Sequence, residues 1–221
     1  MAERINKSVS CPKCGKMNDT SILCSINTKN DEVLCRDLFS GSLFRWRCRY
    51  CNYSAYLLHP LLYNNTEKRF MVYYIPNVDR RQVLDESLEK DFPELHSTVC
   101  KRVVPSVNAF KEKISVLNQG LDDMAVELTK LAVAELVRKR ACADIKDGFF
   151  VETRPDSGII SFQFFIGSEQ KSYLQSTKMA VYNRSLEIVH EHFQRDKLSH
   201  GFLNIDQRWA REALQRYRNI K

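Results

Sequence analysis

Four of the eight cysteines in this 221-residue chain form two pairs with the spacing of metal-binding turns. Cys11 and Cys14 make the first Cys-x-x-Cys pair, and Cys48 and Cys51 make the second. Two thiolates three residues apart fold around one cation, and two such turns supply the tetrahedral set of four that zinc prefers. Four protein ligands leave no position for water, so the spacing predicts one structural zinc ion rather than a catalytic one.

The residue after each pair supports this prediction. A left-handed backbone is common there; Gly15 suits it best, and Asn52 is among the few side chains that tolerate it. Three alternatives stay open: reduced thiols in a small core, a redox pair, or iron or an iron–sulfur cluster on the same ligands. A thioredoxin-type pair occurs once on a βαβ pattern, whereas two pairs lie here among short predicted strands.

The remaining cysteines and a histidine pair do not suggest a second metal site. Histidines two residues apart on a helix point to different faces, so His190 and His192 are not expected to share a metal. Buried thiols are the commoner interpretation for the four other cysteines. They are Cys24, Cys35, Cys100 and Cys142.

A basic row overlaps the second cysteine pair. Between Phe44 and Tyr50 the residues alternate strictly, which places Arg45, Arg47 and Arg49 on one face of a strand and the aromatic residues with Cys48 on the other. Three guanidinium groups on one strand can contact phosphates. The favoured alternative is a solvated outer face over a buried aromatic one.

The charge is basic and is concentrated in the cysteine module, which is compatible with nucleic acid or acidic partners, although a net charge this modest also serves solubility alone. The formal net charge is +7, and residues 1–76 hold 11 Lys and Arg against 6 Asp and Glu. The first seven residues lack the apolar core of an export signal, and the longest nearly apolar stretch, Leu131–Val137, is too short to span a bilayer. We therefore expect a cytoplasmic, reduced protein without a membrane segment.

The elements that must position the cysteines fall into three predicted parts. Residues 1–76 form the cysteine module, 77–100 a charged helical connector, and 101–221 a C-terminal region. In the module we expect a helix capped by Asn30 and stopped by Gly41. Strands are expected at Thr20–Thr28, Leu43–Cys48, Tyr53–His59 and Arg69–Ile75, the last three closing a small antiparallel sheet.

Helices and a hairpin are expected after the connector. Ser106 caps a helix that Gly120 ends, and an apolar stripe from Leu121 to Ala132 predicts a second one. A hairpin at Gly148–Thr153 and Ile159–Ile166 and helices at Ser176–Gln194 and Asp206–Tyr217 follow.

Several segments resemble the CpXC domain family of bacteria and archaea, which is named for its paired Cys-Pro-x-Cys motifs. Besides the two cysteine pairs, the resemblance involves Arg102–Ile114, Gly120–Lys130 and Phe202–Trp209. The second pair departs from the pattern, with Arg49 in place of Pro and Asn52 in place of Gly, but neither change removes a ligand. The resemblance implies an α+β fold, an elaborated zinc ribbon followed by an α+β region, and no activity, because the family is functionally uncharacterised.

Two functions follow as hypotheses. The first is a non-enzymatic binding or regulatory protein whose zinc ribbon docks nucleic acid or a protein partner. The alternative is an enzyme with a site in the C-terminal region that uses Asp122, Asp123 and Glu127. Acidic residues at a helix start, however, ordinarily complement the helix dipole. No phosphate-binding loop, nucleophile elbow or zinc-protease helix is present in the sequence.

Overall fold

The computed structural model describes residues 2–79, 81–83, 98–167, 171–197 and 201–220. Helices and strands are mixed throughout, which confirms the α+β class. The predicted helical connector lies largely outside the described residues, because residues 84–97 are not among them. No helix in the described ranges has both the length and the apolar character needed to cross a membrane.

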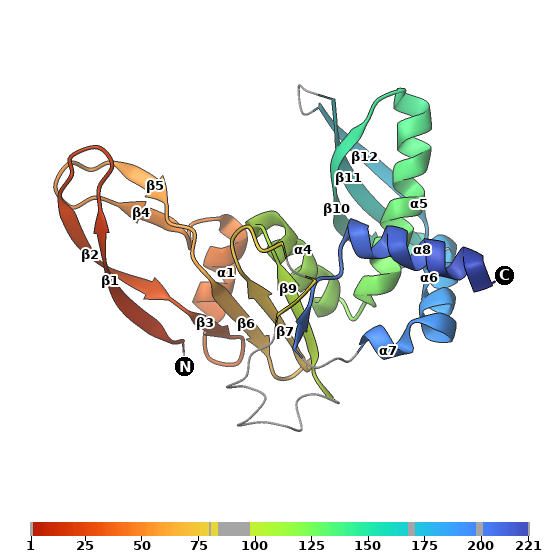
Figure 1. The fold of residues 1–221 in the computed structure, drawn as a ribbon, viewed down its shortest axis with the longest axis horizontal. Coiled ribbons are helices and arrows are strands. Elements are labelled where there is room, and N and C mark those ends of the chain that lie inside the picture. The colour runs from red at the N-terminus through yellow and green to blue at the C-terminus, as the bar shows by residue number, and fades with distance from the viewer. Residues whose placement is uncertain (1, 80, 84–97, 168–170, 198–200, 221) are drawn as a thin grey trace.

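Two antiparallel hairpins form one end of the molecule (Figure 1). The first pairs β1 (Arg4–Ser10) with β2 (Met17–Leu23), and the second pairs β4 (Arg45–Arg47) with β5 (Ser54–Tyr56). Each cysteine pair lies in the turn that joins the two strands of its hairpin. The turns therefore bring the two pairs together from distant parts of the sequence.

A six-stranded mixed sheet occupies the centre of the molecule (Figure 1). In spatial order its strands are β3 (Ser25–Asn27), β6 (Leu61–Asn65), β7 (Phe70–Tyr74), β9 (Cys100–Val104), β13 (Phe202–Leu203) and β8 (Gln82–Val83). Helices α1 (Glu32–Ser40) and α4 (Val107–Asn118) share one core with it, in which Leu38 is buried and the Phe110 ring lies against Tyr63 and Tyr74 of the sheet. Strands from both sides of the predicted connector thus belong to one sheet.

The remaining layer is a three-stranded antiparallel sheet with helices against it. Strands β10 (Ile145–Arg154), β11 (Ile159–Ile166) and β12 (Lys171–Lys178) pair in sequence order. Helix α5 (Asp123–Ala141) packs on this sheet and also contacts α6 (Met179–His192) and α8 (Gln207–Ile220). A short helix, α7 (Gln194–Lys197), follows α6.

The predicted ends of α1 and α4 are confirmed, with one shift, but the helix predicted at Ser176–Gln194 begins only at Met179, because residues 171–178 form β12. Gly41 ends α1 in a left-handed conformation at φ +82°, although Asp31 rather than Asn30 is the N-terminal cap. Ser106 caps α4 by accepting a hydrogen bond from the Ala109 amide, and Gly120 follows its end at φ +71°. These ends depend on contacts within a few residues.

Several strands differ from those predicted. The three strands that were predicted to form one sheet belong to two sheets. Strand β4 pairs with β5, whereas β7 lies in the six-stranded sheet beside β6, a strand that was not predicted. The predicted strand Thr20–Thr28 is interrupted at Cys24, so its halves join different sheets. Strand β12 was also missed, because its side chains are mostly exposed and show no apolar alternation.

Candidate functional site

The four paired cysteines meet between the two hairpin turns. Their sulfur atoms all lie within 4.8 Å of one another, and none of the four is in a disulfide. Cys11 Sγ is 3.7 Å from Cys51 Sγ, and Cys14 Sγ is 3.8 Å from Cys48 Sγ. A tetrahedron with metal–sulfur bonds of about 2.3 Å has edges of about 3.8 Å, so both separations suit a tetrahedral metal–thiolate site. This geometry can hold one metal ion.

The two turns repeat the same backbone geometry. Gly15 donates its amide to the Cys11 carbonyl at 2.8 Å, and Asn52 donates to the Cys48 carbonyl at 3.0 Å. Gly15 has φ +70° and Asn52 has φ +58°, so both adopt the left-handed conformation that the sequence predicted. Asn52 therefore replaces glycine without changing the turn.

Side chains of Asn18 and Trp46 join the two hairpins, and no sequence pattern predicted the hydrogen bonds that they make. Asn18 is 2% exposed; its Oδ1 accepts the Arg49 amide at 3.0 Å, while its Nδ2 donates to the Lys16 carbonyl at 2.9 Å. Trp46 donates its indole N–H to Thr20 Oγ1 at 2.9 Å. These contacts fix one turn against the other across about thirty residues of sequence.

The thiols differ in their acidity. Burial acts to raise the pKa of Cys48, but amide donors of Tyr50 and Cys51 and the adjacent thiols lower it to about 6. The Tyr53 amide acts to lower the pKa of Cys51, but burial and the three other thiols raise it to about 12. Four adjacent thiolates repel one another, so a bound cation is what would allow all four to lose their protons.

The arginine row is exposed, as the alternation predicted. Arg45, Arg47 and Arg49 are exposed, while Trp46 between them is 8% exposed. Opposite them on β5, Arg45 pairs with Tyr56, whose side chain is 61% exposed, and residues opposite each other lie on the same face. The hairpin therefore presents arginines and an aromatic ring on one surface.

Two residue-level predictions were wrong. Tyr50 was placed on the inner face, but β4 ends at Arg47, and Tyr50 is 49% exposed with the Arg49 guanidinium 4.9 Å from its ring centroid. Cys142 was interpreted as a buried thiol, but it is exposed at the end of α5, where it adopts φ +48°. Among the described residues, the cysteine tetrad is the only cluster of three or more metal-ligating side chains within reach of one ion.

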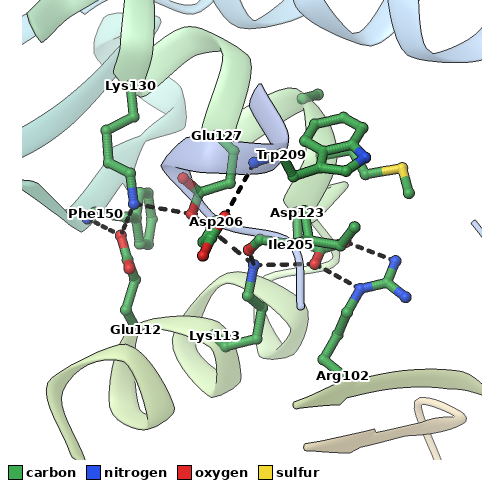
Figure 2. A network of polar contacts seen from close by, with 12 residues as sticks. Arg102, Glu112, Lys113, Asp123, Glu127, Lys130, Phe150, Ile205, Asp206 and Trp209 are labelled. Atoms are coloured by element: carbon green, nitrogen blue, oxygen red, sulfur yellow. Dashed lines mark hydrogen bonds and ion pairs between the residues drawn. The ribbon is translucent and has the colours of Figure 1, made fainter. Parts of the chain in front are cut away.

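Of the three acidic residues of the enzyme hypothesis, one caps a helix and two lie in a buried charged cluster. Asp122 caps α5 by accepting from the amides of Met124 and Ala125, which is the helix-end role of such residues. Asp123 is buried and accepts from Arg102 at 2.7 and 3.0 Å and from Lys113 at 3.0 Å (Figure 2). Glu127 belongs to the same buried cluster but also lines a pocket.

Lysines complete this cluster. Lys130 Nζ donates to Glu112 Oε1 at 2.9 Å and to Glu127 Oε1 at 2.8 Å, and Lys113 Nζ donates to the Ile205 carbonyl at 2.7 Å (Figure 2). All these side chains come from α4, α5 and β9. Charged residues in such segments are ordinarily interpreted as lying on a solvent-exposed face. Sequence patterns gave no indication that they were buried together.

The fold and the tetrad together define an α+β protein with a four-cysteine site of metal-binding geometry. Its sequence matches the CpXC family, described as CpXC protein, over residues 9–130. That match covers more than half of the chain, so the protein belongs to the CpXC family. No curated protein and no solved structure matches this chain. The family match includes all four cysteines and ends before the Phe202–Trp209 segment.

Proposed function

We propose that the cysteine tetrad binds one structural zinc ion, that the two hairpins form a zinc ribbon around it, and that the ribbon docks single-stranded nucleic acid. The observation that carries the proposal is the exposed face of the second hairpin. It combines Arg45 and Arg47 with Tyr56 on two adjacent strands. Arg49 extends the row into the metal-binding turn, so the ion would also hold the docking surface in shape.

The chemistry of this face fits a flexible polyanion. Arginines contact phosphates, and aromatic rings stack on bases that are not paired within a duplex. Lys16 Nζ lies 4.8 Å from the centroid of the exposed Tyr50 ring, which adds a positive charge from the first hairpin. A protein partner is the second candidate, because an acidic surface could use the same arginines; nucleic acid is favoured because exposed aromatic rings lie beside them.

The metal part is tested by elemental analysis of protein purified without added zinc. We expect about one zinc per chain in the parent and loss of zinc in Cys48→Ser. Cys142→Ser is the matched control, because this exposed thiol lies outside the tetrad and its loss should leave the stoichiometry unchanged. Zinc retained at parental stoichiometry by Cys48→Ser would exclude this ligand set.

The docking part is tested by fluorescence anisotropy with labelled single-stranded DNA, single-stranded RNA and duplex DNA. The Arg45→Glu, Arg47→Glu, Arg49→Glu triple variant should bind a single strand at least about tenfold more weakly, with a salt slope reduced by about 2. The control variant changes Lys29, Lys139 and Lys178 to Glu, which alters the net charge by the same amount at exposed positions outside the arginine row. Equal binding by the arginine variant and the parent would rule out this surface.

Base stacking has its own variant. Tyr56→Ala should weaken single-strand binding by about 1–3 kcal/mol, and should have little effect on duplex binding, because paired bases are not available to the ring. Binding of an acidic protein with no binding of any nucleic acid would favour the second candidate.

A further inference from the structure

A pocket of about 190 Å³ lies at the buried charged cluster, away from the cysteine site. Its walls come from α4, α5, β10, β11 and the segment Asn204–Gln207. The inner wall is made by charged side chains that are each no more than 9% exposed. They are Glu112, Lys113, Glu127 and Lys130.

The lysines of this wall already have acceptors. Lys130 donates to Glu112 and to Oε1 of Glu127, and Lys113 donates to Asp123 and to the Ile205 carbonyl (Figure 2). Glu112 Oε1 also accepts the Phe150 amide. The cationic part of the wall is therefore engaged in bonds within the protein.

Glu127 is different. The residue is 3% exposed. Among the buried side-chain oxygens and nitrogens of the described residues, its Oε2 is the one that has no hydrogen-bond partner. Leaving such a group unsatisfied costs about 1–3 kcal/mol, and more when it is charged. Burial raises the pKa of Glu127 despite the nearby Lys130 and Lys113, and Glu112 raises it further. Oε2 has less than 1 Å² of exposed surface, so a donor in the pocket would reach it through a small shift of the Glu127 side chain. Such a donor would supply the missing hydrogen bond and would favour the ionised carboxylate.

Charge and size narrow the class of donor. Four carboxyl groups line the pocket, from Glu112, Glu127, Asp147 and Asp206, against three ammonium groups, from Lys113, Lys130 and Lys146. With all carboxyl groups ionised, the lining carries one excess negative charge, so a monocation complements it. The volume corresponds to about six water molecules at about 30 Å³ each, which suits a ligand with only a few heavy atoms.

The other walls favour an organic cation over a metal ion. Phe149, Phe164, Ile145 and Ala109 supply apolar surface beside the carboxylate. Within the described ranges, no three carboxylates lie close enough here to surround one metal ion. We propose that this pocket binds a small primary ammonium ion, which donates a hydrogen bond to Glu127 Oε2 and packs its carbon chain against the apolar wall.

Calorimetric titration at fixed ionic strength tests this proposal with methylammonium, ethanolammonium and n-butylammonium as probes. Tetramethylammonium, which has no N–H, and acetate, which is an anion, are the control compounds. The expected result is saturable binding of at least one primary ammonium and of neither control compound. No saturation by any primary ammonium up to about 50 mM would overturn the proposal and leave an ordered water as the partner of Oε2.

Two variants locate the site. Glu127→Gln keeps the shape but removes the charge, and it should weaken ammonium binding at least about tenfold. Ala109→Leu leaves Glu127 intact and fills the pocket from α4, so it should also abolish binding even if Glu127→Gln fails to fold. Carboxyl ¹³C resonances supply an independent measurement: the Glu127 signal should shift on titration in the parent. Unchanged affinity in either folded variant, or no shift of that signal, contradicts the assignment.

Discussion

The Asp123→Asn substitution removes a negative charge that two buried cations share. Asp123 is 3% exposed and accepts two hydrogen bonds from Arg102 and one from Lys113. Asn has almost the same shape, so the change leaves packing intact and replaces the carboxylate by a neutral amide. Removing one partner of a buried ion pair costs about 3–5 kcal/mol. At about 2–4 °C per kcal/mol for a chain of this size, the melting temperature should fall by roughly 6–20 °C.

The natural tryptophans allow this loss to be located. Trp209 is 3% exposed and its amide donates to Asp206, next to the Ile205 carbonyl that accepts from Lys113, whereas Trp46 lies between the hairpins. In a Trp46→Phe background, the remaining fluorescence reports unfolding around the charged cluster. Urea titrations of this variant with and without Asp123→Asn measure the difference in the free energy of unfolding.

The pH dependence of the free energy of unfolding is a second test of the Asp123→Asn prediction. Burial acts to raise the pKa of Asp123, but Arg102 and Lys113 hold it well below its ordinary value of 3.8. A carboxyl group with a depressed folded-state pKa contributes stability that is present above about pH 4 and is lost as the pH falls toward the folded value. The difference between parent and Asp123→Asn should therefore be constant near neutral pH and shrink in acid.

A double-mutant cycle with Arg102→Met is the control. Because the two side chains are in direct contact, the double variant should be less destabilised than the sum of the single variants, by about 1–3 kcal/mol. Additive effects, or an Asp123→Asn change below about 1 kcal/mol, would show that the cluster does not depend on this charge and would refute the reasoning.

Three further predictions concern single sites. Gly148→Ala should destabilise by about 1–3 kcal/mol in thermal unfolding, because the added Cβ would lie 2.7 Å from the Phe164 ring. A loss below about 0.5 kcal/mol would argue against a steric clash. In metal-loaded protein at pH 8, iodoacetamide should label the exposed Cys142 before Cys100, because burial raises the pKa of the Cys100 thiol to about 11. Peptide mass spectrometry gives the order of labelling, and faster labelling of Cys100 would contradict the prediction. Thr20→Val should destabilise the protein by about 0.5–3 kcal/mol, because it removes the hydrogen bond from the Trp46 indole. Trp46 fluorescence measures the unfolding, and the control Ser54→Ala, at an exposed position, should cause no change.

Local features of this fold could be predicted because their causes are local. The left-handed residues after the cysteine pairs, the stop at Gly41 and the cap at Ser106 each depend on sterics or hydrogen bonds within a few positions. The cysteine spacing also predicted which four sulfurs meet. Residue type and spacing were sufficient for these assignments.

Pairing between distant segments could not be predicted in the same way. Strand β9 runs parallel to β7 and to β13, and β13 comes about one hundred residues later in the chain. The Lys113 contact with the Ile205 carbonyl likewise spans 92 positions. Arg102, Glu112 and Lys130 are buried only because elements from three parts of the chain close over them, and nothing in their own neighbourhood distinguishes them from surface charges.

The boundary of the family match illustrates the same dependence on distant segments. The match ends at residue 130, inside α5, which continues to Ala141. Helix α5 is buried on several sides because β10, α6 and α8 surround it together with α4. Its apolar face is covered largely by residues beyond the match. All six charged side chains of the cluster lie within residues 9–130, but the Phe150 amide and the Ile205 carbonyl that complete their hydrogen bonds do not. The matched segment therefore buries one core by itself, between the six-stranded sheet and helices α1 and α4, but it leaves α5 to be covered by the rest of the chain. The charged cluster is where the two parts share hydrogen bonds.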